Sequence, residues 1–411
     1  MKLRHSLQAG CGLAVGISLA LAATSKTEPR EKAAVPAPVE VSGLEDPITD
    51  QSWGLHASAS ARSWTLMKGS RDIIVAVIDT GADLNHPDLR ANLWKNAGES
   101  GVVDSAECRR LLTPKCRKET NGIDDDGNGF IDDIHGWNFV SNSDDLTDRH
   151  GHGTHIAGIV GAVGGNGTGL SGVAPEVSLM ILKYYDPHAS EEESIANTVN
   201  AIDYAVKMGA QIINYSAGGL KPHPLERAAI ERARARGVLF VAAAGNESSN
   251  SDLRGYYPAD YGLSNILSVT AVDPRERVLA SSNYGTQTVR LAAPGEEILS
   301  TLPGGRYGYM TGTSQATAFA SGAAAMLLAS DPHFIGEPER IIEQLVNSGR
   351  HAETLRGKTR HGKLLNAYAA LVIRDAETTL GGFVSANAGG QRAELFARET
   401  WGEDITAWTP R

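Results

Sequence analysis

Short apolar runs alternate with helical patterns along most of this chain, and this alternation limits the fold more than any other feature. The run at 73–78 is continuous, rich in β-branched residues and short, which is typical of a strand buried on both faces. The predicted strands are 73–78, 179–182, 211–214, 238–241 and 266–269, and the predicted helices are 152–163, 190–208, 225–236, the stretch after Ser314, and 337–348. Such alternation predicts an α/β fold with three layers, in which helices cover both faces of a mainly parallel, doubly wound sheet.

Composition and net charge limit the classes of molecule that this protein is expected to bind. The 411 residues carry a formal net charge of −10, whereas nucleic acids and anionic lipids are recognised by basic surfaces. Apolar residues make up 41% of the chain, enough for a sizeable core. We therefore expect one large globular domain that binds no nucleic acid.

The first residues resemble a secretory signal peptide. A basic start at 1–5 precedes an apolar run at 11–23 that is too short to cross a bilayer comfortably and ends in small residues. We favour cleavage near Ala22 or Ala23 over an uncleaved anchor. The mature protein is then expected to be secreted or held in the cell envelope or periplasm, with no stable membrane association.

Export also bears on the cysteines. Cys108 and Cys116 would then lie in an oxidising compartment, so a local disulfide between them is favoured over two free thiols.

Residues 24–50, rich in Pro, Glu and Ala, are predicted to form a disordered linker or a short prosegment. The ordered domain is expected at 51–371, followed by a polar C-terminal tail at 372–411.

Ser314 is the candidate nucleophile. It follows Gly312 and Thr313 at the start of a helix of small residues, where free backbone amides favour an anionic intermediate. Ser is also a common helix N-cap, so this position alone does not establish a catalytic role. A nucleophilic Ser needs a base, a carboxylate that orients the base, and a donor for the oxyanion.

Two residues supply the predicted base and carboxylate. Asp79 ends a buried strand, where it can orient an imidazole, although Asp before Thr-Gly is also common in turns. His152 lies among three closely spaced histidines at the opening of a helix and is the predicted base. A zinc site is the poorer account of these histidines, because the Glu of the H-E-x-x-H pattern is missing. His155 is expected to serve in packing or hydrogen bonding.

Asn246 is the candidate oxyanion donor. It follows the strand at 238–241 through a small-residue segment, so its amide could act together with the backbone amide of Ser314. An isolated Asn at such a place would be read as a turn or cap residue. The interpretation therefore depends on the other three residues.

Together these motifs resemble the subtilisin-like serine proteases, or subtilases. The resemblance rests on four motifs in this order: Asp79-Thr80-Gly81, Gly151-His152-Gly153-Thr154-His155, Ala244-Gly245-Asn246 and Gly312-Thr313-Ser314. It extends over about residues 51–371 and implies a serine endopeptidase with the Asp-His-Ser chain order of subtilisin. An α/β-hydrolase esterase fits less well, because Ser314 does not lie in G-x-S-x-G.

The resemblance also implies how substrate binds. Ser216-Ala217-Gly218 would pair with the substrate backbone, and Ala243-Ala244-Gly245 would line the pocket for the residue before the scissile bond. Polypeptides are the expected substrates, and a monomer is the expected state. Gln315 and Ala318 stand where subtilases commonly have Met and Pro. These departures, with the short prosegment, leave a catalytically inactive peptide-binding protein as the alternative.

An acidic loop at 121–133 predicts a calcium site. Its oxygen-bearing residues alternate as in the first half of an EF-hand loop, and His135 stands where the closing Glu would be. The expected ligands are Asp124, Asp126, Asn128, the Phe130 carbonyl, Asp132 and, as a possible closing ligand, Asp133. Similar loops in subtilases bind Ca²⁺, so we expect a structural ion that takes no part in catalysis.

Overall fold

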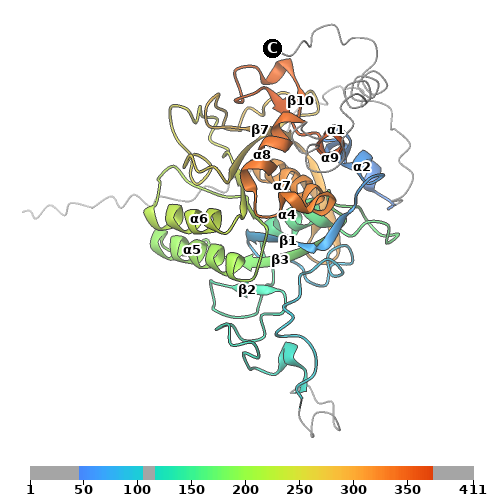
Figure 1. Ribbon diagram of the computed structural model, residues 1–411, viewed down its shortest axis with the longest axis vertical. Helices are drawn as coiled ribbons and strands as arrows, with labels where there is room; N and C mark the ends of the chain where they lie inside the picture. The colour runs from blue at the N-terminus through green and yellow to red at the C-terminus, as the bar shows by residue number, and fades with distance from the viewer. Residues whose placement is uncertain (1–45, 105–115, 374–411) are drawn as a thin grey trace, which may run out of the picture. The chain divides into compact units, whose positions relative to one another are not determined.

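The computed structural model describes residues 46–104 and 116–373, and their main feature is a nine-stranded sheet (Figure 1). The strand order is β10-β11-β7-β6-β5-β4-β1-β3-β2, and every pair is parallel except β10 with β11. The strands are β1 (Gly69–Asp79), β2 (Gly136–Asn138), β3 (Glu176–Lys183), β4 (Ile212–Tyr215), β5 (Leu239–Ala243), β6 (Ile266–Val272), β7 (Leu291–Pro294), β10 (Arg350–His351) and β11 (Lys363–Leu364).

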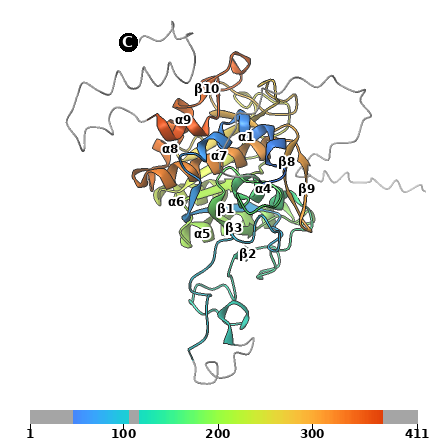
Figure 2. The ribbon, with the colours of Figure 1, turned by 90° about the vertical axis from the view of Figure 1, so that its right-hand side faces the viewer.

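The sheet lies between two layers of helices (Figures 1 and 2). One layer holds α4 (His152–Gly161), α7 (Thr313–Ser330) and α8 (Pro338–Asn347), and the other holds α5 (Glu191–Lys207) and α6 (Pro224–Ala235). Short helices α1 (Trp53–Ala57), α2 (Ser60–Ser63) and α9 (Ala367–Val372) add residues to the first layer. The predicted three-layer αβα fold with a mainly parallel sheet is confirmed.

Strand β1 shows why the sheet forms where the apolar run predicts it. Val75 and Val77 join the core under α4 and α7, whereas Ala76 and Ile78 join the core under α5 and α6. All four side chains are fully buried. A strand covered on both faces needs apolar residues at every position, which explains the continuous run.

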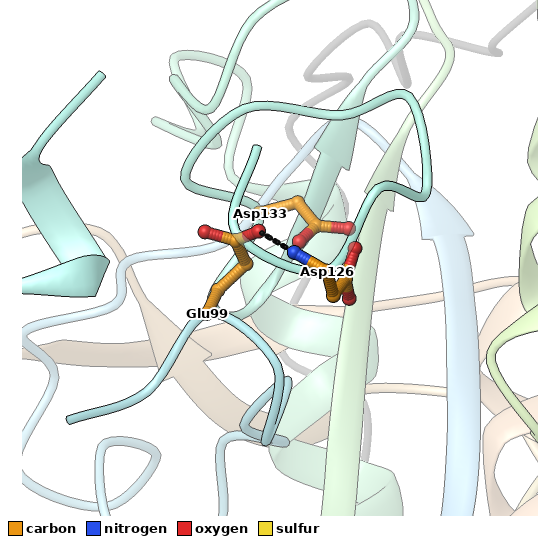
Figure 3. Close-up of side chains that lie close together, drawn as sticks. All are labelled: Glu99, Asp126 and Asp133. Atoms are coloured by element: carbon orange, nitrogen blue, oxygen red, sulfur yellow. Dashed lines mark hydrogen bonds between the residues drawn. The ribbon is translucent and has the colours of Figure 1, made fainter. Parts of the chain in front are cut away.

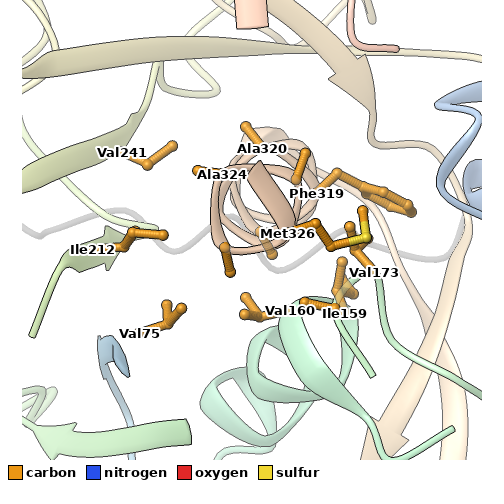
Figure 4. Close-up of a cluster of buried hydrophobic side chains, with 14 of the residues drawn as sticks. Val75, Ile159, Val160, Val173, Ile212, Val241, Phe319, Ala320, Ala324 and Met326 are labelled. Atoms are coloured by element: carbon orange, nitrogen blue, oxygen red, sulfur yellow. The ribbon is translucent and has the colours of Figure 1, made fainter. Parts of the chain in front are cut away.

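Helix α7 is almost entirely buried, as Figure 4 shows in a view along its axis. Ala320 and Ala324 are fully buried in the core that α7 shares with strands β1, β4 and β5. At Gly322 a Cβ atom would lie 2.6 Å from Cβ of Val173, so a larger residue would push the helix away. The small residues of α7 therefore set the position of its first turn, which carries Ser314.

Several elements differ from the sequence-based expectation. Strands β2, β7, β10 and β11 were not predicted, because they are short and rich in small or polar residues. Strands β8 (Ile298–Leu302) and β9 (Arg306–Met310) form a separate antiparallel hairpin that also escaped prediction. Asp46, in the predicted linker, is buried and accepts hydrogen bonds from the amides of Gly165 and Gly167. The end of the predicted linker is therefore ordered.

Some predictions fall outside the described residues. They include the signal segment 1–23, most of the linker and tail, and Cys108, the expected partner of the buried Cys116. Among the helices of residues 46–104 and 116–373, none has the length and apolar character to cross a membrane.

Candidate active site

Asp79 and His152 meet at the carboxyl end of β1. Asp79 is the last residue of β1 and His152 is the first of α4. The Nδ1 atom of His152 lies 2.7 Å from Oδ1 and 2.9 Å from Oδ2 of Asp79. Because a carboxylate only accepts hydrogen bonds, Nδ1 is the donor, and in the neutral ring Nε2 carries the lone pair. This is the tautomer that a general base requires.

The close approach of α4 to β1 depends on a glycine. A Cβ atom on Gly153 would lie 2.1 Å from the carbonyl oxygen of Gly81 and 3.1 Å from Cβ of Asp79. Any other residue would therefore push α4 away from the end of β1. The glycine after His152 thus fixes the distance between the imidazole and the carboxylate.

Asp148 holds the turn that presents His152, and sequence reasoning did not identify it. Its Oδ1 accepts hydrogen bonds from the Gly151 amide at 2.8 Å and the Thr80 hydroxyl at 2.9 Å. Its Oδ2 accepts from the amide and hydroxyl of Thr154 at 2.9 and 2.7 Å. An Asp four residues before the predicted helix start is the sequence signal that could have revealed this role, because Asp often accepts hydrogen bonds from the free amides of a helix N-terminus.

The surroundings of His152 change its basicity. Burial favours the neutral ring, but the charge and hydrogen bond of Asp79 and the charge of Asp148 outweigh that effect. The pKa of His152 is therefore raised above its ordinary value. The site is suited to holding a proton on His152 during a reaction.

Ser314 lies at the start of α7 and is 8% exposed. Its hydroxyl donates to the carbonyl oxygen of Ser216 at 2.9 Å, and the Ser216 hydroxyl donates to the Ser314 carbonyl at 3.0 Å. Ser216 directly follows β4. This reciprocal pair ties the first turn of α7 to the carboxyl end of the sheet.

The Asn246 side chain is fixed through its oxygen. Oδ1 accepts hydrogen bonds from the amide and hydroxyl of Thr313 at 3.0 and 3.2 Å. The Nδ2 atom is therefore the group that remains to donate to a ligand. A Cβ atom built on Gly312 would lie 3.6 Å from this Nδ2, so the amide lies beside the turn that leads into Ser314.

The predicted substrate-binding segments are neighbours. Strands β4 and β5 pair in parallel, with Tyr215 opposite Ala242. Ser216-Ala217-Gly218 continues from β4, and Ala243-Ala244-Gly245 covers the end of β5 and the two residues that follow. Both segments therefore leave the carboxyl edge of the sheet at adjacent positions, the edge at which ligands gather in such folds.

His155 is a structural residue in this arrangement. It is fully buried, and its Nε2 lies 3.0 Å from the Ile298 carbonyl and 3.2 Å from the Gly308 carbonyl. Burial and the neighbouring His152 lower the pKa of His155 to about 3. The ring is therefore neutral and joins α4 to the β8–β9 hairpin.

A second cluster, of acidic side chains, lies on the segment that extends beyond β2 in Figures 1 and 2. Glu99, Asp126 and Asp133 bring carboxylate oxygens within 4.8 Å of one another (Figure 3). Oε1 of Glu99 accepts from the amides of Asp125 and Asp126, whereas its buried Oε2 has no hydrogen-bond partner among the described residues. Sequence reasoning missed Glu99 because it precedes the acidic loop by more than 20 residues.

The cluster fits a hard cation. Burial raises the pKa of Glu99 and of Asp133 despite the hydrogen bonds that each accepts. A divalent cation would compensate carboxylates that otherwise repel one another, and oxygen ligands are those that Ca²⁺ prefers. Of the predicted ligands, Asp126 and Asp133 belong to this cluster.

The other predicted ligands make local contacts. Asp124 accepts hydrogen bonds from the amides of Asn128 and Gly129 at 3.0 and 2.7 Å. Asn128 accepts from the Phe130 amide and donates to Asp133. Asp132 accepts from the Gly122 amide at 2.9 Å. These groups shape the loop around the cluster.

Comparison with known proteins agrees with the fold. The chain is 35% identical over 283 residues to a thermophilic serine proteinase of Bacillus sp. (strain AK1), covering 69% of this chain and 58% of that protein. It is 34% identical over 278 residues to the major intracellular serine protease of Bacillus subtilis (strain 168), covering 67% and 74%. It is 31% identical over 309 residues to subtilisin-like protease 1 of Plasmodium vivax, covering 71% of this chain and 46% of that protein.

The chain thus spans about half the length of two of these relatives. The sequence profile described as "Subtilase family" matches residues 70–369, which is most of the part that the structure describes. The chain belongs to the subtilase family.

Proposed function

We propose that this protein is a serine endopeptidase that hydrolyses peptide bonds through an acyl-enzyme on Ser314. The observation that carries the proposal is the hydrogen bond between His152 Nδ1 and the Asp79 carboxylate at the carboxyl edge of the sheet. This pair prepares a base with the correct tautomer, and the chain belongs to a family whose relatives are named as serine proteases.

In the proposed reaction, the Ser314 hydroxyl turns from the Ser216 carbonyl toward Nε2 of His152. His152 accepts the proton as Ser314 Oγ attacks the substrate carbonyl, and Asp79 stabilises the imidazolium. His152 then gives the proton to the leaving amine. Water, activated in the same way, hydrolyses the acyl-enzyme.

The negative charge that develops on the substrate oxygen needs donors that are already in place. Nδ2 of Asn246 is one, since Thr313 holds the side-chain oxygen, and the Ser314 amide at the start of α7 is the other. Both are positioned before substrate binds, so little reorganisation accompanies the reaction.

The proposed substrate is an extended polypeptide. Its backbone would pair with Ser216-Ala217-Gly218, and the side chain before the scissile bond would lie toward Ala243-Ala244-Gly245. Main-chain pairing tolerates many sequences, and the local pocket adds side-chain preference. We propose that the enzyme acts as a monomer.

Replacing Ser314 by Ala tests the function. The purified variant should fold like the wild type and lose both peptide hydrolysis and labelling by a fluorophosphonate. Ser321→Ala, a buried serine further along α7, is the matched control and should retain labelling. Hydrolysis that survives Ser314→Ala would contradict the proposal. A wild type that binds peptides but is neither labelled nor active would be the non-catalytic relative.

We further propose that Ca²⁺ binds the Glu99, Asp126 and Asp133 cluster and stabilises the fold. Oε2 of Glu99, which has no hydrogen-bond partner within residues 46–104 and 116–373, and the crowded carboxylates support this assignment. Asp124, Asn128, the Phe130 carbonyl and Asp132 are the remaining candidate ligands. The ion would hold the loop and supply no chemistry to the reaction.

Secretion or export to the periplasm also belongs to the proposal, because the first 23 residues have signal-peptide character. Fractionation of the native host, followed by N-terminal mass spectrometry of the mature protein, tests it. A mature protein in the cytosol that retains Met1 would contradict export.

A further inference from the structure

The ring of Tyr256 lies between the two segments proposed to bind substrate. A Cβ atom built on Gly218 would be 2.6 Å from Cε1 and 3.1 Å from Cζ of Tyr256. A Cβ atom built on Gly245 would be 2.8 Å from Cγ of the same ring. The ring thus spans from one glycine to the other, and both must lack a side chain for it to fit.

Hydrogen bonds hold the backbone that carries this ring. The Tyr256 amide donates to Oδ2 of Asp260 at 2.7 Å. The next residue, Tyr257, exchanges two backbone hydrogen bonds of 2.8 Å with Gly219, which directly follows Gly218. Moving the ring away by a backbone shift would break this bridge. The position of Tyr256 is therefore linked directly to the segment that would pair with substrate.

The ring is also well buried. Tyr256 is 7% exposed, so its side chain is packed against the protein and does not extend freely into solvent. Such a ring leaves its site only if its packing is lost or a new rotamer is accepted. The ring therefore occupies part of the pocket that the two segments would otherwise form.

We infer that Tyr256 restricts the residue immediately before the scissile bond to small side chains such as Gly, Ala and Ser. The inference rests on the proposed endopeptidase function, which places that side chain toward Ala243-Ala244-Gly245. A large side chain would have to occupy the volume of the ring, whereas a small one requires no displacement. Forcing extra side-chain volume into a packed site costs free energy, because the surrounding side chains can move only slightly.

The test uses two peptides that differ only in having Ala or Phe before the scissile bond. For the wild type, kcat/KM should be larger for the Ala peptide by roughly tenfold or more, the scale of discrimination that a close-fitting pocket provides. Tyr256→Ala should reduce this ratio by a similar factor, mainly through faster cleavage of the Phe peptide. Tyr256→Phe keeps the ring and should keep the preference.

Each ratio is measured on one preparation, so a smaller folded fraction in Tyr256→Ala cancels. As a second measurement, sites cut by the wild type in an unfolded protein are mapped by mass spectrometry. They should be enriched in small residues before the cut.

Equal or faster cleavage of the Phe peptide by the wild type would overturn the inference. So would an unchanged ratio in Tyr256→Ala. In both cases hydrolysis that still requires Ser314 would leave the proposed function intact. A wild type that cleaves neither peptide and reacts with no fluorophosphonate would refute the function, and the inference with it.

Discussion

Replacing Asp148 by Asn should weaken both the fold and the basicity of His152. Asp148 is 5% exposed, and its two oxygens accept hydrogen bonds from the turn before α4 and from the first turn of α4. The amide of Asn can keep the contacts of one oxygen, but its NH₂ group would then face the buried amide of Thr154. An unsatisfied buried donor costs about 1–3 kcal/mol, and the remaining bonds lose the assistance of a full charge. We therefore expect a loss of roughly 2–4 kcal/mol in the free energy of unfolding.

The same change should alter the pH dependence of activity. The charge of Asp148 helps to raise the pKa of His152, so its removal lowers that pKa. The base acts only when it is deprotonated, and a lower pKa keeps it deprotonated at lower pH. The acidic limb of the kcat/KM profile should therefore move to lower pH in Asp148→Asn.

Urea unfolding measures the first effect, and a pH profile of peptide hydrolysis measures the second. Asp144→Asn is the matched control, because it removes the same charge from an exposed position in the same loop. It should leave stability and the pH profile close to those of the wild type. The reasoning would be refuted if Asp148→Asn were as stable as this control, or if its acidic limb moved to higher pH.

Two further predictions concern the oxyanion site and the acidic cluster. Asn246→Ala should lower kcat about 100- to 1,000-fold with little change in KM, because the lost donor acts mainly in the transition state. A kcat equal to that of the wild type would show that Asn246 does not stabilise the oxyanion. Ca²⁺ should raise the melting temperature of the wild type, and Glu99→Gln should lose most of that gain while Asp144→Asn keeps it. Identical calcium responses in Glu99→Gln and the wild type would exclude Glu99 as a ligand.

Much of the central fold follows from local sequence patterns. The continuous apolar run at 73–78 predicts the core of β1, because a strand that is covered by helices on both faces carries apolar side chains on both faces. The helix predicted at 190–208 appears as α5, Glu191–Lys207, and begins where the Ser190 hydroxyl accepts from the Glu193 amide. The apolar pattern is weaker in β7, a four-residue strand of small residues ending in Pro294, and in the β8–β9 hairpin. The sequence therefore predicts neither.

The candidate site likewise combines features that the sequence predicts with features that only the structure shows. Asp79, His152, Asn246 and Ser314 could be proposed from the sequence, because each stands in a short motif at the end of a strand or the start of a helix. Their catalytic roles stay predictions. The structure adds the hydrogen bond between Asp79 and His152, and the fixed oxygen of Asn246.

The sequence by itself determined the layered architecture and the residue types available for chemistry, since both depend on periodicity and motifs within a few residues. Only the tertiary structure decided which distant groups meet. It places Glu99 beside Asp126, the ring of Tyr256 between Gly218 and Gly245, and Asp148 against Thr80. The physical reason is that contacts of this kind depend on how strands and loops far apart in the chain pack together, and no local pattern records that packing.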